Sequence, residues 1–375
     1  MKLLEAEFRD FRNLRQTRFE PAGGVNVLTG QNGQGKTNIL EGIWLLCGQH
    51  SFRQAKDRET VCVGKKEAKI KAVIGGAARN VSAELTVTNR REAYVNGIKL
   101  AKASELGEHF AAVVFSPLHI GLVREAPEVR RAFVDSAVLS TKPGFGAVLR
   151  EYDKVLFHRN YLLKSLQRGY DSELGDMLAA YTERMAKTGG RVWAARSRYT
   201  ARLAQTAPLL YGELSGGETL EITYEGASDY ATAADYAASL YEKLNKSTDE
   251  DIANGFSGFG PHREDILFSI QGKRAKTFAS QGQLKSAALC LKLAEGRILE
   301  QAIGEKPVFL LDDVLSELDR TRQNYVLNSL GDNQIFITCC DCRQLRGKLN
   351  AAVFSVADGA IKPRAERRKA ECSRT

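Results

Sequence analysis

The sequence predicts an α/β protein in which a mainly α-helical lobe is inserted into a domain of mixed sheets and helices. Three observations predict this fold class. A glycine-rich loop near the N-terminus lies between a strand-like run and a helical pattern, alternating and turn residues at 68–100 indicate β-hairpins, and residues from about 120 to 250 change to helical periodicity. The expected segments are 1–118 and 251–361 for the α/β domain, 119–250 for the lobe, and 362–375 for a basic tail.

The α/β domain is expected to begin with a strand over residues 3–8, which alternate in hydropathy. Asn96 and Gly97 follow an apolar run and predict a tight hairpin turn, because both residue types accept a positive φ. Residues 283–300 have the spacing of an amphipathic helix. The other expected strands cover 25–29, 68–74, 81–87, 110–115, 221–224, 265–270, 307–311 and 334–338, and the helices of the lobe cover 148–166, 174–185 and 192–203.

Composition and charge limit the environment of the chain. A hydrophobic fraction of 43% is enough for a core, and no apolar run reaches the roughly 18 residues of a membrane span. The N-terminus carries Glu5, Arg9 and Asp10 where a signal peptide needs an apolar stretch, so we expect a cytoplasmic protein with no membrane partner. A formal net charge of +9 is compatible with a polyanionic partner.

The cysteines are sparse, at seven in 375 residues, which suits a reducing compartment. Cys339, Cys340 and Cys342 follow the expected strand 334–338 and raise the question of a metal site. No second Cys or His pair lies at ligand spacing, so we interpret these cysteines as small apolar residues at the end of a buried strand.

The glycine-rich loop matches the pattern G-x-x-x-x-G-K-[ST] without a mismatch. Such a loop wraps phosphates with inward-pointing backbone N–H groups at the start of a helix. Lys36 is expected to reach the β- and γ-phosphates of ATP as a catalytic residue, and the Thr37 hydroxyl is expected to bind Mg²⁺. The predicted cofactor-binding residues of the loop are Gly30, Gln31, Asn32, Gly33, Gln34, Gly35, Lys36 and Thr37.

Two carboxylates end the apolar strand 307–311, and their position indicates a second part of the same site. In ATPases with this loop, the first acid at such a strand end holds Mg²⁺, and the second orients and deprotonates the attacking water. We assign these roles to Asp312 and Asp313. Adjacent buried charges are otherwise costly without a partner, which argues against a purely structural interpretation.

The run from Asp312 to Asp319 is similar to the Walker B motif and D-loop of ABC-type ATPases, so the fold class sharpens to an ABC-type P-loop head. Those enzymes carry a serine–glycine signature that contacts the γ-phosphate bound by a second copy. Leu214–Glu218 looks closer to the usual signature than Ser280–Gln283 does. The signature must open a helix that leads into the Walker B strand, and only Ser280 precedes such a helix. We therefore predict Ser280, Gly282 and Gln283 as cofactor-binding residues.

With these motifs in place, the chain resembles the RecF family of bacterial DNA-repair ATPases over nearly its whole length. The motifs that carry the resemblance are the glycine loop, LLDDVLSELD, the Ser280 signature, and the runs 8–13, 114–117, 130–135, 157–160 and 260–265. The resemblance implies an ABC-like head with a helical second lobe and ATP-driven head-to-head dimerisation. It also implies binding to single-stranded or gapped DNA, RecA loading with RecO and RecR, replication restart after DNA damage, and support of the SOS response.

Three positions depart from the wider ABC pattern. Ser116 stands where a glutamine is usual, Thr338 where a histidine is common, and Asp313 where a glutamate acts as base. Each change weakens the expected alignment of the attacking water, so we predict slow ATP hydrolysis in a protein that acts as a switch.

Other P-loop classes fit the sequence less well. Asn245–Thr248 is near the guanine-reading pattern N-K-x-D but lacks its carboxylate, and the signature helix has no role in a kinase. A transporter-type or SMC-type ABC subunit is the alternative, although the inserted lobe is large for the first and far too short for the arm of the second. Candidate DNA contacts are Arg53, Lys56, Arg58, Arg130, Arg131 and the basic tail, each with a solvated surface charge as the competing interpretation.

Overall fold

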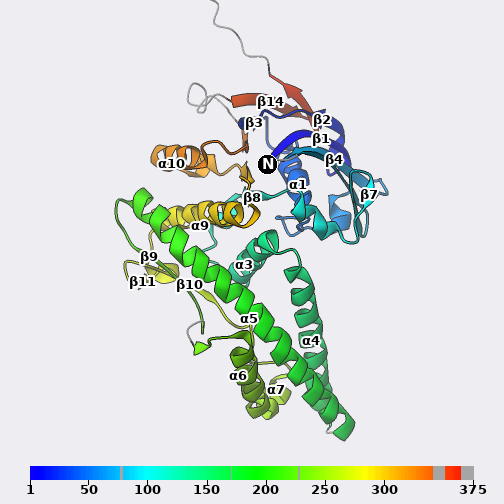
Figure 1. Ribbon diagram of the computed structural model, residues 1–375, viewed down its shortest axis with the longest axis vertical. Coiled ribbons are helices and arrows are strands. Elements are labelled where there is room, and N and C mark those ends of the chain that lie inside the picture. Colours follow the sequence, from blue (N-terminus) through cyan, green and yellow to red (C-terminus); the bar gives the residue numbers. More distant parts are fainter. Residues whose placement is uncertain (77–78, 170, 227–228, 341–350, 365–375) are drawn as a thin grey trace, which may run out of the picture. The chain divides into compact units, whose positions relative to one another are not determined.

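The computed structural model describes residues 1–76, 79–169, 171–226, 229–340 and 351–364 (Figure 1). The chain divides into two compact units, Met1–His119 with Leu299–Thr375 and Ile120–Ile298, which we call the head unit and the lobe unit. The first boundary lies next to the expected one. The second lies at 298/299 instead of 250, because the strand at Ile266–Ile270 pairs with Leu220–Tyr224 inside the lobe unit.

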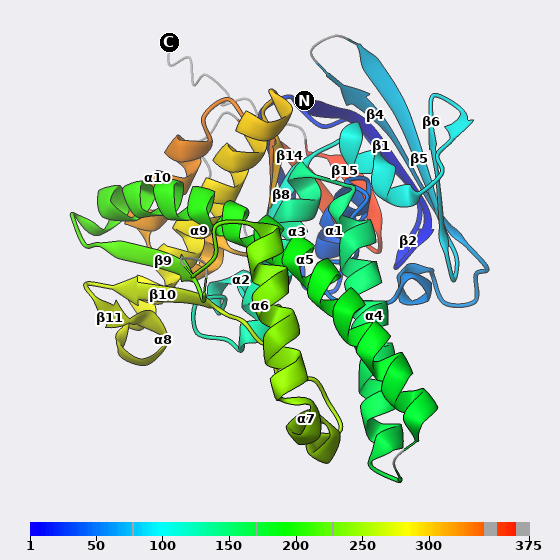
Figure 2. The ribbon, with the colours of Figure 1, turned by 60° about the horizontal axis from the view of Figure 1, so that its bottom comes forward.

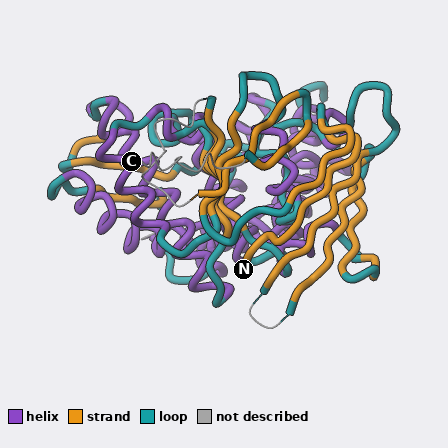
Figure 3. Tube along the Cα trace, turned by 90° about the horizontal axis from the view of Figure 1, so that it is seen from above, coloured by secondary structure: helices purple, strands orange, loops and turns teal. Residues whose placement is uncertain are grey.

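One sheet of the head unit is antiparallel, with the order β2-β1-β4-β5-β6-β7. Figure 3 shows its strands as orange tubes side by side at the right. The expected turn at Asn96 and Gly97 is confirmed, with φ of 50° and 79°. The strands are β1 Lys2–Phe11, β2 Leu14–Phe19, β4 Ala68–Gly75, β5 Asn80–Val87, β6 Arg91–Val95 and β7 Ile98–Lys99.

The other sheet of the head unit has the order β15-β14-β3-β13-β12-β8, and all its neighbours from β14 to β8 pair in parallel. Its central strands are continuous buried runs, as expected for a parallel sheet covered on both faces. The strands are β3 Val25–Thr29, β8 Ala112–Phe115, β12 Val308–Asp312, β13 Ile335–Cys339, β14 Ala351–Ala357 and β15 Ala360–Pro363.

Helix α1, Lys36–Leu45, connects the two sheets of the head unit through the core. Its Ile39, Leu40, Ile43 and Trp44 are buried in one cluster with residues of both sheets, such as Phe8 of β1. The remaining elements of the head unit are η1 Asp57–Thr60, η2 Ala103–Glu108, α2 Pro117–Ile120, η4 Leu315–Glu317 and α10 Arg320–Leu330, with α2 crossing the boundary by one residue.

The lobe unit is mainly helical, and α4, α5 and α6 run beside one another in Figure 2. The helices expected at 174–185 and 192–203 are one helix, α5, of 44 residues. Gly190 in its middle faces α6, where an added Cβ would lie 2.4 Å from the Ala233 carbonyl oxygen, so glycine permits close packing there. The elements are α3 Pro127–Thr141, α4 Phe145–Leu166, α5 Ser172–Ser215, β9 Leu220–Tyr224, α6 Ala233–Lys246, α7 Thr248–Asn254, β10 Ile266–Ile270, β11 Lys273–Arg274, α8 Ala275–Phe278 and α9 Gln281–Ile303, whose last turn belongs to the head unit.

Candidate functional site

The glycine loop connects the end of β3 to the first residue of α1, as the motif predicts. Gly33 and Gly35 have φ of 79° and 108°, a region that L side chains rarely occupy. An added Cβ at Gly30 would lie 2.2 Å from the Val356 carbonyl oxygen of β14. Both backbone conformation and close packing therefore require glycine in this loop.

Residues of the first hairpin hold α1 in place under the loop. Asn13 Oδ1 accepts a hydrogen bond of 2.8 Å from Asn38 Nδ2. Arg12 donates from Nε and a terminal nitrogen to the two carboxylate oxygens of Glu41, at 2.9 and 2.7 Å, and Glu41 is completely buried. Glu41 was not among the predicted site residues, although a carboxylate among the apolar residues of the helix start is a signal that could have found it.

The loop is also fixed from the side of β14 and β15. The backbone N–H of Asp358 donates to Gln34 Oε1 at 2.7 Å, and the N–H of Gly359 donates to the Gln34 carbonyl at 3.0 Å. Cys340 Sγ donates to Asn32 Oδ1 at 3.0 Å. The side chains of Gln34 and Asn32, which are expected to bind the cofactor, thus also support the loop. Cys342, the third cysteine of the 339–342 run, lies outside the described residues.

The Lys36 ammonium group lies over its own loop. It donates to the carbonyl oxygens of Gly30 at 2.7 Å and of Gln31 at 2.9 Å, and the side chain is largely buried. No carboxylate within the described ranges forms an ion pair with this ammonium group. Its charge is held by neutral dipoles alone, which leaves it suited to an anion.

The strand ends meet the loop at a cavity of about 480 Å³. Strand β13 lies between β3 and β12, and Thr338 near its end pairs with Leu28 of β3 on one side and with Asp312 of β12 on the other. Asp312 Oδ1 accepts hydrogen bonds from Thr37 Oγ1 at 2.8 Å and from Thr338 Oγ1 at 2.9 Å. Thr37 and Asp312 therefore present two oxygen atoms side by side, which fits the hard-oxygen preference of Mg²⁺.

The two adjacent carboxylates have different environments. Burial raises the pKa of Asp312, and the hydrogen bonds from Thr37 and Thr338 oppose that rise. Asp313 is exposed, and its backbone has a φ of 51°. Its N–H donates to Thr338 Oγ1 at 2.9 Å, and Ser316 Oγ donates to its carbonyl at 2.7 Å. Left-handed backbone at a residue other than glycine is uncommon and often marks a functional site.

Further residues line the same cavity. Ser116, at the expected glutamine position, borders it together with Pro117 and Leu118. Arg53, a candidate DNA contact, also lines the cavity, with one guanidinium nitrogen 3.1 Å from Asn38 Oδ1 and 3.7 Å from a Glu41 oxygen. This places Arg53 at the pocket. Lys56 and Arg58 are exposed on η1 and its N-cap, and their contact with DNA stays a prediction.

Two of the expected DNA contacts are wrong. Arg130 is 4% exposed and forms two hydrogen bonds to the Asp265 carboxylate, at 2.7 and 2.6 Å. Arg131 is 9% exposed and donates to the Glu264 carbonyl at 2.8 Å. Both guanidinium groups are buried inside the lobe unit, so neither is a surface charge available to phosphates.

The proposed signature lies in the lobe unit, at the start of α9. The N–H of Ser280 donates to Gln283 Oε1 at 2.9 Å, and the N–H of Gln283 donates to Ser280 Oγ at 3.2 Å. These reciprocal bonds form a capping box, so the expectation that Ser280 opens a helix before β12 is confirmed. Ser215 is instead the last residue of α5, and Gly216 ends that helix in the left-handed conformation.

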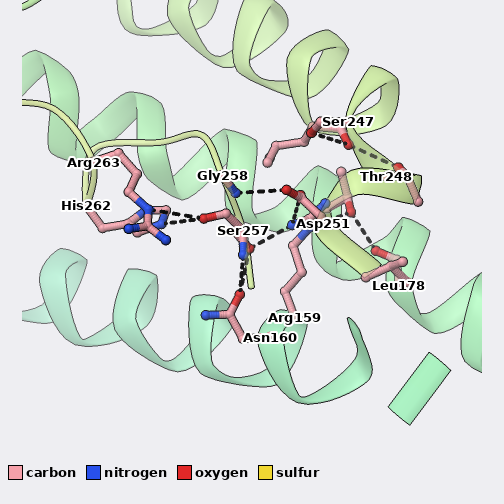
Figure 4. Close-up of polar contacts among 12 residues, drawn as sticks. Arg159, Asn160, Leu178, Ser247, Thr248, Asp251, Ser257, Gly258, His262 and Arg263 are labelled. Atoms are coloured by element: carbon pink, nitrogen blue, oxygen red, sulfur yellow. Dashed lines mark hydrogen bonds and ion pairs between the residues drawn. The ribbon is translucent and has the colours of Figure 1, made fainter. Parts of the chain in front are cut away.

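The motifs at 157–160 and 260–265 form a buried polar network in the lobe unit (Figure 4). Arg159 is fully buried and donates to Asp251 at 2.8 Å and to Ser257 Oγ at 2.7 Å. His262 Nε2 donates to the Ser257 carbonyl at 3.1 Å, and its Nδ1 lies 2.7 Å from the Tyr152 hydroxyl. Burial lowers the pKa of His262 to about 4. These side chains connect α4, α7 and the segment before β10.

No helix within the described residues combines the length and apolarity needed to span a membrane. The described part of the chain also holds no group of three or more His, Cys, Asp or Glu side chains placed to bind a metal ion.

Comparison with known proteins covers nearly the whole chain. The family model for the RecF/RecN/SMC N terminal domain matches residues 2–361. The DNA replication and repair protein RecF of Thermoanaerobacter sp. (strain X514) is 35% identical over 357 residues, which cover 94% of this chain and 97% of that protein. The protein of the same name from Bacillus subtilis (strain 168) is 33% identical over 372 residues, covering 96% and 100%.

Solved structures agree with this comparison. The recombination mediator protein RecF-ATPrS in the RecFOR pathway superimposes with a TM-score of 0.90 at 34% identity, over 97% of this chain and 98% of that one. An Smc head domain derived from Pyrococcus furiosus matches with a TM-score of 0.53 at 14% identity, over 96% of this chain and 95% of that one. The second likeness supports the fold alone, that of an ABC-type head with a helical insertion.

Proposed function

Because the chain belongs to the RecF family of DNA replication and repair proteins, we propose that it is an ATP-dependent switch that dimerises on DNA during recombinational repair. In this proposal it acts in the cytoplasm with RecO and RecR to help load RecA at single-stranded or gapped DNA. It supports replication restart and SOS induction by the same activity. The full-length match to RecF relatives favours this function over a transporter-type or SMC-type subunit.

The observation that carries the proposal is the cavity between the glycine loop and the carboxyl ends of β12 and β13. Backbone N–H groups of the loop and the Lys36 ammonium would bind the phosphates of ATP. Thr37 and Asp312 would hold Mg²⁺, whose chemistry is to neutralise charge on the β- and γ-phosphate oxygens. Their present hydrogen bond of 2.8 Å keeps both oxygens at one point of the pocket.

Hydrolysis is slow in this proposal. Asp313 is the base that accepts the proton of the attacking water, and its side chain is one methylene shorter than the usual glutamate. Its left-handed backbone is fixed through Thr338 and Ser316. Ser116 offers only a short hydroxyl to the same cavity. Precise placement of reacting groups supplies much of catalysis, so these short side chains favour a long-lived ATP state.

A second copy of the chain completes the site. Ser280 at the exposed start of α9 would donate its hydroxyl hydrogen to the γ-phosphate held by the facing copy. The helix N-terminus adds a favourable dipole for that anion. ATP would therefore hold two copies together, and its hydrolysis would release them.

Exposed basic residues supply the DNA contacts. Lys56 and Arg58 of the head unit are exposed, as are Lys362 and Arg364 at its described C-terminal end. Contacts to phosphates position a protein on DNA without reading its sequence. They release counterions from the DNA, and this release is less favourable at high salt concentration, so the affinity falls. We expect little sequence preference and a steep decrease of DNA affinity with salt.

Sedimentation velocity tests the proposal directly. The parent chain should be a monomer without nucleotide and a dimer with a non-hydrolysable ATP analogue, and gapped DNA should strengthen the dimer. Ser280→Arg should still bind the analogue and remain a monomer, because the large cation occupies the space of the γ-phosphate. Glu221→Arg on the exposed side of β9 is the matched control and should dimerise. A parent chain that stays monomeric with bound analogue contradicts the proposal.

A further inference from the structure

The two serine–glycine motifs of the sequence are in contact in the lobe unit. Glu218, the last residue of the Leu214–Glu218 motif, accepts hydrogen bonds from Gln283 Nε2 at 3.0 and 3.1 Å, one to each carboxylate oxygen. Gln283 is the last residue of the Ser280 motif. The sequence presented the two motifs as alternatives, and the structure connects them residue to residue.

The end of α5 is built to return Glu218 to this place. Gly216 and Gly217 have φ of 76° and 107°, so both turn the chain through conformations that favour glycine. The N–H of Gly217 donates to the Gly212 carbonyl at 2.9 Å, and the N–H of Glu218 donates to Ser215 Oγ at 3.1 Å. The Tyr211 hydroxyl, one helical turn before the end of α5, donates to Glu218 Oε2 at 2.7 Å.

The carboxylate decides which way the Gln283 amide points. A glutamine amide has a donor nitrogen at one end and an acceptor oxygen at the other, and an ionised carboxylate is only an acceptor. Glu218 therefore selects the nitrogen and directs Gln283 Oε1 toward the N–H of Ser280, 2.9 Å away. A reversed amide would place two donors face to face at Ser280.

This orientation determines what the signature offers to a ligand. Ser280 Oγ accepts from the N–H of Gln283, so the hydroxyl hydrogen stays available to donate outward. The Gln283 amide is engaged at both ends, by Ser280 and by Glu218. Gln283, expected to contact the cofactor, is on this geometry a residue that shapes the signature instead.

We infer that Glu218 is a positioning residue for the ATP-dependent dimer: it orients Gln283, which holds Ser280 ready for the γ-phosphate of the facing copy. The inference rests on the proposed function, because the ligand of Ser280 is the nucleotide of a second copy. It assigns the Leu214–Glu218 motif a task inside the signature rather than a nucleotide site of its own.

A charge exchange between the two positions tests the inference in the full-length chain. Gln283→Glu keeps a capping-box acceptor for Ser280 and places a second carboxylate against Glu218, so the dimer formed with a non-hydrolysable ATP analogue should weaken by about tenfold, or about 1.4 kcal/mol. Adding Glu218→Gln to Gln283→Glu places an amide donor at position 218 against the new carboxylate acceptor at position 283. This exchanged pair should recover the dimer. Glu218→Ala alone should weaken the dimer to a similar extent, and Glu221→Ala is the control.

Three readouts separate the outcomes: the dimer constant with the analogue, analogue binding to the monomer, and the unfolding midpoint. Analogue binding to the monomer should be nearly unchanged in every variant, since the substitutions are in the lobe unit and the glycine loop is in the head unit. The unfolding midpoint should stay well above the assay temperature in every variant, so that each dimer constant is measured on folded protein. Equal loss in Gln283→Glu and in the exchanged pair overturns the inference, as does a Glu218→Ala variant that dimerises like Glu221→Ala. A parent chain that does not dimerise with the analogue defeats the proposed function itself, and the two failures are therefore distinguishable.

Discussion

The head unit and the lobe unit each contain a cluster of buried polar residues, and the two clusters differ in whether their cation is paired with an anion. In the lobe unit, Arg159 is enclosed by the side chains of Asp251, Ser257 and Thr182. In the head unit, the Lys36 ammonium is held by neutral carbonyls and Asp312 by two hydroxyls. A cation paired with an anion has a structural explanation, whereas a cation and an anion held apart around a cavity have room for a charged ligand.

This difference separates motifs that look equally informative in the sequence. The run at 260–265 and the glycine loop both support the family assignment, but only the loop borders the cavity. His262 and Glu264 of the first run bind Tyr152 and Tyr236 within the lobe unit. We therefore expect substitutions in the lobe network to change stability first, and substitutions at the cavity to change nucleotide chemistry first.

The largest effect on stability is expected at Arg159. Arg159→Met leaves the Asp251 carboxylate, 2% exposed, without its cation and should lower the free energy of unfolding by about 3–5 kcal/mol. Arg184→Met is the control, because the Arg184–Glu151 pair is exposed and should contribute less than about 1 kcal/mol. Urea denaturation of both variants measures the difference. Equal unfolding midpoints would remove the structural role of the network.

Acid should weaken the lobe unit through His262. Its pKa is lowered from 6.5 to about 4 in the folded chain, so the unfolded chain binds the proton more readily. The contribution of His262 to the free energy of unfolding is therefore fully present above pH 6.5 and is lost as the pH falls toward 4. The loss amounts to about 3 kcal/mol.

His262→Asn removes this titration while keeping a polar side chain. The variant should be less stable than the parent at pH 7 and should lose less stability between pH 6.5 and 4. Urea midpoints at several pH values measure both slopes. Parallel slopes would assign the acid sensitivity to other groups.

The smallest effect is expected for the exposed basic residues. Lys56→Ala with Arg58→Ala removes two phosphate contacts, so the slope of log affinity for DNA against log salt should decrease by about 2. Stability should be unchanged, since both side chains are exposed. Fluorescence anisotropy with gapped DNA at several salt concentrations measures the slope. A slope equal to that of the parent would place the DNA contacts elsewhere.

The sequence predicted the parts of the molecule that depend on local patterns. The glycine-rich loop between a strand and a helix, the Asn96–Gly97 turn and the apolar strands were predicted from residue type and spacing alone. The structure contains each of them. The capping box at Ser280 was likewise within reach of a local rule.

Features that depend on tertiary contacts were not predicted. Arg130 and Arg131 look like surface charges until Asp265 and the Glu264 carbonyl are placed beside them, 135 and 133 residues away in the chain. The division at 298/299 depends on β10 pairing with β9 across a helical segment. Thr338 bonds both Asp312 and the Asp313 N–H, and Thr37 bonds the same Asp312 oxygen, only because β13 lies between β3 and β12. No local pattern gives that strand order.

The rate of ATP hydrolysis by Lys36→Met tests the central claim most directly. Lys66→Met, an exposed lysine of the same unit, is the control for loss of one positive charge. The account predicts that Lys66→Met binds and hydrolyses ATP like the parent, and that Lys36→Met loses hydrolysis by about 100- to 1,000-fold, because an aimed cation no longer faces the phosphates. Unchanged turnover in Lys36→Met would contradict the assignment of the cavity as the nucleotide site.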